Sequence, residues 1–377
     1  MQQDSSFENE IKLDNESKQF HIGTQIILFI LILILFLFSL EMMSASALKI
    51  NFFLNENVKY AINNPFIALV IGLLITAIFQ SSSTTTTISV VMVASGIISL
   101  KAAIPIVMGA NIGTTITAII TTISHINGKK EFKKATSAAM LHHLFNLFTA
   151  CILFPVEYYT SAFSNLAQYI GEKVSYFIDG IEPQTGLKFY SKGYAILETI
   201  IPNGLVLFIL SLLLLFISIK LFNQLMKNSL IGDSQKIITH YIFGGALRSF
   251  SWGLFSTSLI HSSAVTTSFI VPIVATDKIS LKKAFPFIVG ANIGTTFTAI
   301  VAALTKSPEA MSIAMAHFLF NLCGMLLFLP IPKVRDYIIE IVKKIGEIAR
   351  DYKVLVIIYV FLIFFVIPFI LIYLNRN

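Results

Sequence analysis

The sequence predicts an all-α polytopic membrane protein with two inverted repeats, whose broken or re-entrant helices carry the Gln-Ser-Ser-Ser motifs. Its 377 residues are 55% hydrophobic and 12% charged, whereas soluble domains are about 45–50% apolar and about 25% charged. Two hydroxyl-rich clusters interrupt long apolar runs, and short motifs recur in the second half. The composition therefore predicts a membrane protein, the hydroxyl clusters predict helix breaks, and the recurring motifs predict an internal duplication.

Apolar stretches long enough to cross a bilayer define the expected helices, since about 20 apolar residues span the hydrocarbon core. We expect them near 25–43, 66–98, 103–123, 138–156, 196–220, 240–276, 285–305, 311–330 and 354–374. The first run has no basic segment before it and no small-residue cleavage site close behind it. We therefore interpret it as a retained first helix rather than a signal peptide.

The hydroxyl clusters lie at mid-length of two of these stretches. They are Gln80-Ser-Ser-Ser-Thr-Thr-Thr-Thr87 and His261-Ser-Ser-Ala-Val-Thr-Thr-Ser268. Polar groups in hydrocarbon are costly without partners, and unwound backbone at membrane depth persists only where protein or water satisfies it. We therefore expect each helix to break at its cluster, and both clusters to contribute to one polar site.

The duplication can be followed along the chain. Gly109-Ala-Asn-Ile-Gly-Thr-Thr115 and Gly290-Ala-Asn-Ile-Gly-Thr-Thr296 are identical and lie 181 positions apart, the spacing that also relates the hydroxyl clusters. Further on the spacing is 175, where His142-His-Leu-Phe-Asn146 matches His317-Phe-Leu-Phe-Asn321. Such duplication is typical of transporters that hold their site at the repeat interface.

Charges in the connecting segments predict the orientation. Segments 125–137 and 221–237 carry an excess of Lys, whereas 157–195 carries more acidic than basic residues. By the positive-inside rule the first two are cytoplasmic and the third is external, and the basic segment 333–353 is also expected inside. The two repeats are therefore predicted to be inverted. The net charge of +7 is thus topological information, and no basic and aromatic surface for nucleic acid is present.

These observations predict an organisation in seven parts. We expect a polar N-terminal segment (1–24), a first helix plus transport repeat 1 (25–156), an external loop (157–195), a linking helix and cytoplasmic loop (196–239), transport repeat 2 (240–332), an amphipathic interfacial helix (333–353) and a C-terminal membrane helix (354–377). The amphipathic helix is predicted because apolar residues, from Val334 to Ile348, recur at helical spacing among charges.

The polar residue types favour ion binding. Side-chain oxygens of Gln, Ser, Thr and Asn suit a hard alkali cation, and N–H and O–H groups at half-helix N-termini can hold an anion. Two simpler roles stay open: hydroxyls can bond back to their own helix, and the small residues of Gly-Ala-Asn-Ile-Gly-Thr-Thr can allow close helix packing. Neither role prevents Asn111, Asn292, Thr115 and Thr296 from also facing the site.

Ionisable residues in apolar stretches are further candidates. Arg248 is a strong cation near the start of the 240–276 stretch, so it either contributes to the site or extends to the membrane interface. His142, His143 and His317 are expected to make hydrogen bonds between helices rather than to bind a metal, because no carboxylate or Cys lies at ligand spacing. Cys151 and Cys323 are expected to be small core residues.

At these motifs the chain resembles the type II sodium-dependent phosphate cotransporters. The resemblance rests on Gln80-Ser-Ser-Ser83 with its Thr run, both Gly-Ala-Asn-Ile-Gly-Thr-Thr copies, Glu131-Phe-Lys-Lys-Ala135 leading to Phe145-Asn146, and His317-Phe-Leu-Phe-Asn321 leading to Leu329-Pro-Ile-Pro332. It covers most of the chain, from about Asn64 to Pro155 and from about Gly244 to the C-terminal helix.

The resemblance implies a secondary active transporter, not an enzyme, that couples phosphate uptake to sodium ions, with no covalently bound cofactor. The expected partners are inorganic phosphate, sodium ions and membrane lipid. With the candidates named above, the substrate-binding set is Gln80, Ser81, Ser82, Ser83, Ser262, Ser263, Asn111, Asn292 and Arg248. The candidate sodium ligands are Gln80, Ser83, Thr84, Thr115, Ser263, Thr266, Thr267 and Thr296.

The second cluster departs from the family pattern, because His261 and Ala264 replace a Gln and a third Ser. Since His titrates near neutral pH, we expect His261 to make transport depend more steeply on pH than in a relative with Gln. The 157–195 segment is short and has no Cys, unlike the disulfide-bearing external loop of animal relatives. This favours a multi-pass protein of the bacterial inner membrane.

Three other functions compete with phosphate symport. A sodium-coupled carrier of sulfate or a carboxylate would use the same chemistry, and charge alone does not separate these anions. An intramembrane hydrolase would need Ser262 or Ser263 to pair with His261, but adjacent residues form a poor nucleophile and base pair, and no Gly-x-Ser-x-Gly motif is present. A channel is disfavoured because inverted repeats are typical of alternating access.

Overall fold

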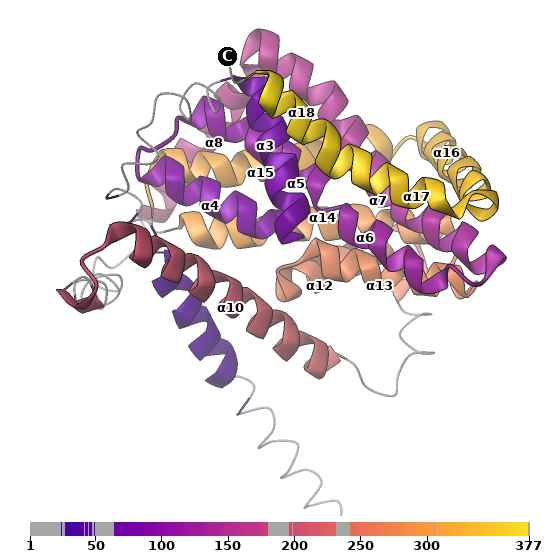
Figure 1. Ribbon diagram of the computed structural model, residues 1–377, viewed down its shortest axis with the longest axis horizontal. Helices are drawn as coiled ribbons and strands as arrows, with labels where there is room; N and C mark the ends of the chain where they lie inside the picture. Colours follow the sequence, from indigo (N-terminus) through magenta and orange to yellow (C-terminus); the bar gives the residue numbers. More distant parts are fainter. Residues whose placement is uncertain are drawn as a thin grey trace, which may run out of the picture.

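The computed structural model describes residues 24, 27–40, 42–43, 45–46, 49, 64–179, 196–197, 199–230, 242–304 and 306–375 (Figure 1). All regular structure in this part of the chain is helical, as expected. Five helical segments in it are long and apolar enough to cross a membrane: Leu100–His125, Lys129–Thr160, Leu281–Ala303, Pro308–Phe328 and Lys353–Leu374. The chain is therefore an all-α polytopic membrane protein. Most of segment 1–24, residues 180–195 of the expected external loop (157–195) and residues 231–239 of the expected cytoplasmic loop lie outside the described residues.

Both stretches that carry a hydroxyl cluster consist of two helices. In the first half, α3 (Pro65–Phe79) is followed by α4 (Ser82–Ala94). In the second half, α12 (Ala246–Ile260) is followed by α13 (Ser263–Ala275). The two breaks occur at equivalent positions, two residues long in each case, as the hydroxyl clusters predict.

The identical heptapeptides are not identical in structure. In the first half, α5 (Leu100–Gly113) ends within the motif, and α6 (Ile116–Thr121) and the 3₁₀ turn η2 (Thr122–His125) follow. In the second half, α14 (Leu281–Ala303) runs through the motif without interruption. The same seven residues therefore respond to different tertiary surroundings.

Each repeat continues beyond its last expected span into an amphipathic helix. The long helix α7 (Lys129–Thr160) leads to α8 (Ala162–Asp179), and α15 (Pro308–Phe328) leads to α16 (Pro332–Asp351). The packing is reciprocal, since α8 packs on α15 and α16 packs on α7. In Figure 1, α8 and α16 lie on opposite sides of the bundle.

Glycines allow both of these crossings. A Cβ atom at Gly171 of α8 would overlap Ser312 of α15, and a Cβ atom at Gly346 of α16 would overlap Ser137 and the backbone of Lys133 in α7. Gly171 and Gly346 are equivalent under the 175-residue spacing, and so are Ser137 and Ser312. The duplicated unit is therefore longer than expected, because it includes the amphipathic helices.

Several element boundaries differ from expectation. The segment expected as an external loop (157–195) contains the end of α7 and all of α8, and α10 (Gly204–Leu230) continues past the expected end of the linking helix at 220. The buried residues of α16 are Ile338, Ile339, Val342, Gly346 and Ala349. Of the expected apolar stripe only Ile338 is among them, and this face packs on α7.

The C-terminal stretch is one interrupted helix. It comprises α17 (Lys353–Phe361), the π-helical turn η3 (Leu362–Val366) and α18 (Ile367–Leu374). Only Phe364 and Pro368 are buried along these three elements. The other residues are half-buried or exposed, and η3 and α18 pack on α3.

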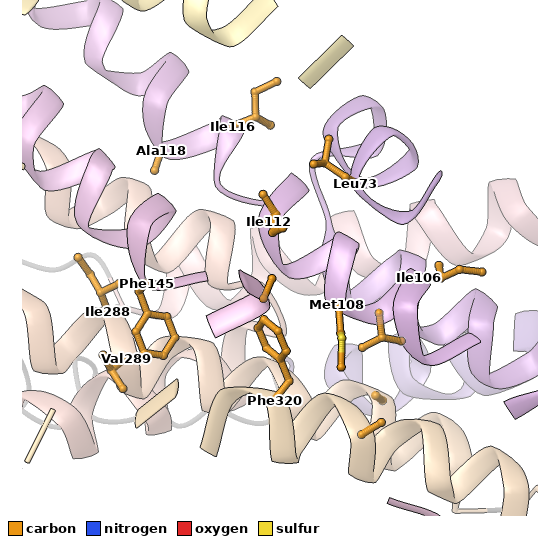
Figure 2. Close-up of a cluster of buried hydrophobic side chains, with 14 of the residues drawn as sticks. Leu73, Ile106, Met108, Ile112, Ile116, Ala118, Phe145, Ile288, Val289 and Phe320 are labelled. Carbon is orange, nitrogen blue, oxygen red and sulfur yellow. The ribbon is translucent and has the colours of Figure 1, made fainter. Parts of the chain in front are cut away.

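A single hydrophobic core joins the two halves. It includes Leu73, Ile106 and Met108 from the first half and Ile288, Val289 and Phe320 from the second (Figure 2). A small second cluster, with Met42 and Leu207 at its centre, lies where α10 runs beside the helix Ile27–Leu40 (Figure 1). The core thus places the helix breaks of both halves within one body.

Charged residues connect the halves at one end of α7. Asp277, in the turn between α13 and α14, adopts a left-handed backbone conformation (φ 63°) and pairs with Lys134 and, at 3.8 Å, with Lys130. The hydrogen bond from Lys134 holds the pKa of Asp277 below its usual value. The pairing is therefore fully formed at neutral pH and is lost only as the pH falls through this lowered pKa.

Candidate binding site at the two helix breaks

The two breaks have the same backbone geometry. Gln80 (φ 55°, ψ 30°) and His261 (φ 57°, ψ 22°) are left-handed, and the Ser that follows each is extended, with φ −149° in both cases. A left-handed conformation is unfavourable for residues with a side chain and persists where the surrounding structure enforces it. Its occurrence at both breaks shows that the two halves of the chain share this backbone geometry.

The breaks expose the N-termini of α4 and α13. The Ser81 hydroxyl accepts a hydrogen bond from Thr84 N (3.2 Å), and the Ser262 hydroxyl accepts one from Val265 N (3.3 Å). Each cap satisfies one of the four N–H groups that a helix N-terminus leaves without a helical partner. The other first-turn N–H groups carry partial positive charge and can bind an anion.

A direct hydrogen bond joins the two breaks. The hydroxyl of Ser83 in α4 donates to the carbonyl oxygen of His261 at the end of α12 (2.9 Å). The equivalent of Ser83 in the second half is Ala264, which has no hydroxyl to make the reciprocal bond. The two half-sites are therefore in contact but unequal.

Ser82 and Ser263 are the equivalent first residues of α4 and α13. Both are buried, each with 2% of its surface exposed. No side-chain hydrogen bond of either hydroxyl is made within the described residues, whereas the neighbouring Ser81, Ser83 and Ser262 hydroxyls are all engaged. These two hydroxyls are therefore free to contact a ligand.

Asn and His residues of the recurring motifs hold the halves together. His142 Nε2 lies 2.9 Å from Asn292 Oδ1, and His317 Nε2 lies 3.2 Å from Asn111 Oδ1. Each pair joins a His of one half to the Asn of the other, and the two pairs are equivalent by the repeat spacing. The His residues thus make the expected bonds between helices. The side-chain oxygens of Asn111 and Asn292 therefore accept hydrogen bonds within this network.

Five threonines among the candidate sodium ligands share one arrangement. Each donates its only hydroxyl proton to a nearby oxygen at 2.7–3.0 Å: Thr84 to Ser81 Oγ, Thr115 to Ile112 O, Thr266 to Ser262 O, Thr267 to Ser263 O and Thr296 to Ile293 O. A hydroxyl that donates in this way keeps its oxygen lone pairs as acceptors. This arrangement suits cation ligands.

Some buried hydroxyls were not among the predicted site residues. Thr86, Thr87 and Thr257 have buried oxygens with no hydrogen-bond partner in the part of the chain that the structure describes. Thr86 is the repeat equivalent of Thr267, whose oxygen lies 3.2 Å from His142 Nδ1. Comparing the two clusters position by position would have identified Thr86 from the sequence.

Of the predicted site residues, Arg248 lies away from this group, and the side chain of Gln80 is exposed. Arg248 is exposed in the first turn of α12, and the whole length of that helix, about 20 Å at 1.5 Å per residue, separates it from His261. Gln80 lies at the break, but its side chain is exposed and its amide makes no hydrogen bond within the described residues. The structure therefore gathers the hydroxyl residues of both clusters and leaves Arg248 outside.

His261 is held by its own repeat. Its Nδ1 atom lies 2.8 Å from the Thr298 hydroxyl, and its ring packs at an angle against Phe297, with 6.0 Å between the ring centroids. The imidazole is therefore directed toward α14 and makes no hydrogen bond to the neighbouring Ser262 or Ser263 in the described structure. This geometry does not provide the nucleophile and base pair that a hydrolase would need.

Paired broken helices that meet at a neutral polar centre within a polytopic bundle define the architecture of secondary transporters. The comparisons agree with this class. A family model described as Na+/Pi-cotransporter matches residues 35–171 and 214–350, which together exceed half of the chain. The chain therefore belongs to the Na+/Pi-cotransporter family. Each matched segment holds one copy of every duplicated motif.

Individual relatives are similar over most of the chain. Sodium-dependent phosphate transport protein 2B of Homo sapiens is 29% identical over 84% of this chain, and the 2B protein of Pongo abelii is 30% identical over the same share. Sodium-dependent phosphate transport protein 2A of Ovis aries is 29% identical over 81%. The chain spans only 59–60% of the length of these relatives. No solved structure matches it.

Proposed function

We propose that this protein is a sodium-coupled symporter that carries inorganic phosphate into the cell. The observation that carries the proposal is the meeting of the two helix breaks, which the Ser83 to His261 hydrogen bond joins directly. Two half-helix N-termini and two unengaged serine hydroxyls converge there. The relatives named above are sodium-dependent phosphate transport proteins.

Phosphate is the ligand for the serine half-sites in this proposal. The oxygens of a phosphate dianion accept hydrogen bonds, and at most one of them carries a proton. A site for phosphate therefore has to provide hydrogen-bond donors. The first-turn N–H groups of α4 and α13 and the hydroxyls of Ser82 and Ser263 provide such donors without a permanent positive charge. Because no fixed cation holds the anion, phosphate can be released on the other side of the membrane.

Sodium binds to hydroxyl and carbonyl oxygens next to the same breaks. The lone pairs of Thr84, Thr115, Thr266, Thr267 and Thr296 and the buried oxygens of Thr86 and Thr87 are the candidate ligands. Sodium binds first in this proposal and orders the breaks, so that their N–H groups can accept phosphate. The charge of sodium also offsets the repulsion between phosphate and the surrounding carbonyl oxygens.

The cycle that follows is alternating access between inverted repeats. Support comes from the reciprocal contacts of α8 with α15 and of α16 with α7, and from the two equivalent His–Asn pairs. A pseudo-two-fold axis in the membrane plane would relate these contacts and exchange the two faces of the bundle. The Cys-free segment 157–195 favours the bacterial inner membrane.

Competition in proteoliposomes separates phosphate from the other anions. We expect sodium-dependent uptake of labelled phosphate that unlabelled phosphate abolishes and that equal concentrations of sulfate or a short carboxylate leave nearly unchanged. Sulfate has no protonated oxygen, so it cannot donate to an acceptor at the site as monohydrogen phosphate can. Strong inhibition by sulfate, or sulfate uptake in place of phosphate uptake, would favour the sulfate carrier.

The His261→Gln variant tests the pH dependence. Protonation of His261 would place a positive charge beside the break and disfavour sodium there. Because the imidazole packs against Phe297 and is largely removed from solvent, it takes up a proton only in acid. We therefore expect the sodium affinity of the wild-type protein to decline more steeply than that of the variant between pH 6 and pH 4. Uptake at several sodium concentrations measures this. Parallel pH profiles would remove His261 as a pH-sensing residue and leave the transport proposal intact.

A further inference from the structure

His143 lies between the first repeat and the C-terminal helix. It is fully buried in α7, and its two ring nitrogens have separate partners. The Nδ1 atom lies 2.7 Å from the Thr115 hydroxyl, and the Nε2 atom lies 2.6 Å from the Tyr359 hydroxyl in α17. A three-residue chain of hydrogen bonds therefore links the C-terminal helix to a candidate sodium ligand.

The positions of the protons in this chain follow from the acceptors. Thr115 Oγ1 lies 2.7 Å from the Ile112 carbonyl oxygen, which has no proton, so the single Thr115 proton must lie between these oxygens. The bond to Thr115 then requires a proton on Nδ1 of His143. A neutral ring protonated at Nδ1 has a lone pair at Nε2, so Tyr359 donates to it.

The direction of these bonds controls what Thr115 can bind. With Nδ1 as the donor, the Thr115 hydroxyl points its proton at Ile112 and keeps a lone pair for a cation. Without the Tyr359 hydroxyl, His143 is free to carry its proton on Nε2 and to accept from Thr115 instead. The Thr115 hydroxyl would then turn away from the Ile112 carbonyl, and its lone pairs would change direction.

The C-terminal helix packs on α3 through α18 and η3, and Tyr359 and Phe364 bring it into contact with His143 as well. Phe364, one of its two buried side chains, lies against the His143 ring with centroids 5.5 Å apart, and the Tyr359 ring meets it edge-on at 5.6 Å. Both aromatic residues flank or occupy the π-helical turn η3, and such turns are rare and occur frequently at functional sites. Tyr359 and Phe364 of this helix therefore both contact the buried imidazole of His143.

The second repeat has no such chain. The residue equivalent to His143 is Phe318, which cannot hydrogen bond to Thr296. The motif that contains Thr296 is one continuous helix, whereas the motif that contains Thr115 breaks after Gly113. Beside Thr115, the hydroxyls of Thr114 and Thr117 have no partner within the described residues. The His143 chain thus occurs at the copy of the motif whose helix is interrupted and where two hydroxyls next to Thr115 have no partner in the described part of the chain.

We propose that Tyr359 is a positioning residue for sodium binding. Through His143 it sets the tautomer that directs the Thr115 lone pair toward the cation, which makes the C-terminal helix part of the transport machinery. The proposal rests on the proposed function in one respect, namely that Thr115 is a sodium ligand. It assigns a role to a helix that follows both repeats in the chain and has few buried side chains.

Sodium-dependent thermal stabilisation of the purified protein tests this inference without transport. In Tyr359→Phe we expect the sodium concentration for half-maximal stabilisation to rise by about three- to ten-fold, and the unfolding temperature without sodium to fall by only a few degrees, the effect of losing one buried hydrogen bond. Tyr373→Phe is the matched control, since Tyr373 is an exposed tyrosine of α18. It should match the wild-type protein.

A double-mutant cycle distinguishes positioning from general loosening of the helix. His143→Phe introduces the residue of the second repeat, and combining it with Tyr359→Phe should weaken sodium binding no further, because both changes remove one chain. Fully additive effects, or an unchanged sodium response in Tyr359→Phe, would overturn the inference. A wild-type protein that sodium does not stabilise would instead contradict both the proposed function and this inference.

Discussion

The Ser82→Ala and Ser263→Ala variants are each expected to lose most of their phosphate uptake. These hydroxyls are the only ones at the two N-terminal turns that the described structure leaves unengaged, and both are buried beside the meeting point of the breaks. A hydrogen bond to a charged group contributes about 1.5–3 kcal/mol, which corresponds to a loss of phosphate affinity of about ten- to a hundred-fold. Initial rates of labelled phosphate uptake, measured over a range of phosphate concentrations, provide the comparison.

Ser89→Ala is the control for this pair. Ser89 is a buried serine of α4, the helix of Ser82, and lies two turns beyond the break. Its hydroxyl donates to the carbonyl oxygen of Thr85. Its removal should leave phosphate affinity unchanged. All three proteins should be present in the membrane at similar amounts. Normal uptake by both the Ser82 and the Ser263 variants would show that the serine half-sites do not bind the substrate.

Gly253→Ala is expected to destabilise the whole protein. A Cβ atom at this position would lie 2.9 Å from the carbonyl carbon of Phe287 and 3.1 Å from the nitrogen of Ala291. Both atoms belong to the backbone of α14, so the two helices must separate. Overpacking of this kind costs about 3 kcal/mol or more, which corresponds to a fall of about 6 °C or more in unfolding temperature.

The equivalent Gly72→Ala change should have a similar effect, because a Cβ atom there would meet the Ile106 backbone. Gly245→Ala is the control, since a Cβ atom at Gly245, just before α12, would have no neighbour within 4 Å. It should cost less than about 1 kcal/mol. Thermal unfolding in detergent measures all three variants. Equal stability of Gly253→Ala and Gly245→Ala would contradict the close contact between α12 and α14.

The breaks were predictable because their cause is local. Hydroxyl residues in the middle of an apolar stretch cannot be satisfied by lipid, and the serine after each break is a good helix N-cap. The duplication was also visible, since seven identical residues recur. The full length of the repeat was not predicted. Ile170-Gly-Glu172 and Ile345-Gly-Glu347 share the 175-residue spacing and were the available signal.

Other features depend on contacts between distant residues. Nothing in the heptapeptide itself explains why it breaks after Gly113 and stays helical after Gly294, because the two copies are identical. The difference coincides with a contact of Thr115 to His143, residues that only the tertiary structure brings together. Arg248 likewise belongs to the same apolar stretch (240–276) as the second hydroxyl cluster but lies at the far end of α12 from the break.

The most direct test of the central claim is concentrative uptake driven by sodium alone. Proteoliposomes with equal phosphate on both sides receive an inward sodium gradient, and labelled phosphate is followed over time. If the joined breaks form one sodium and phosphate site, internal phosphate should rise above the external concentration and return to it when the gradient is collapsed with a sodium ionophore. Phosphate that only equilibrates, at the same rate with sodium or with potassium, would contradict the account.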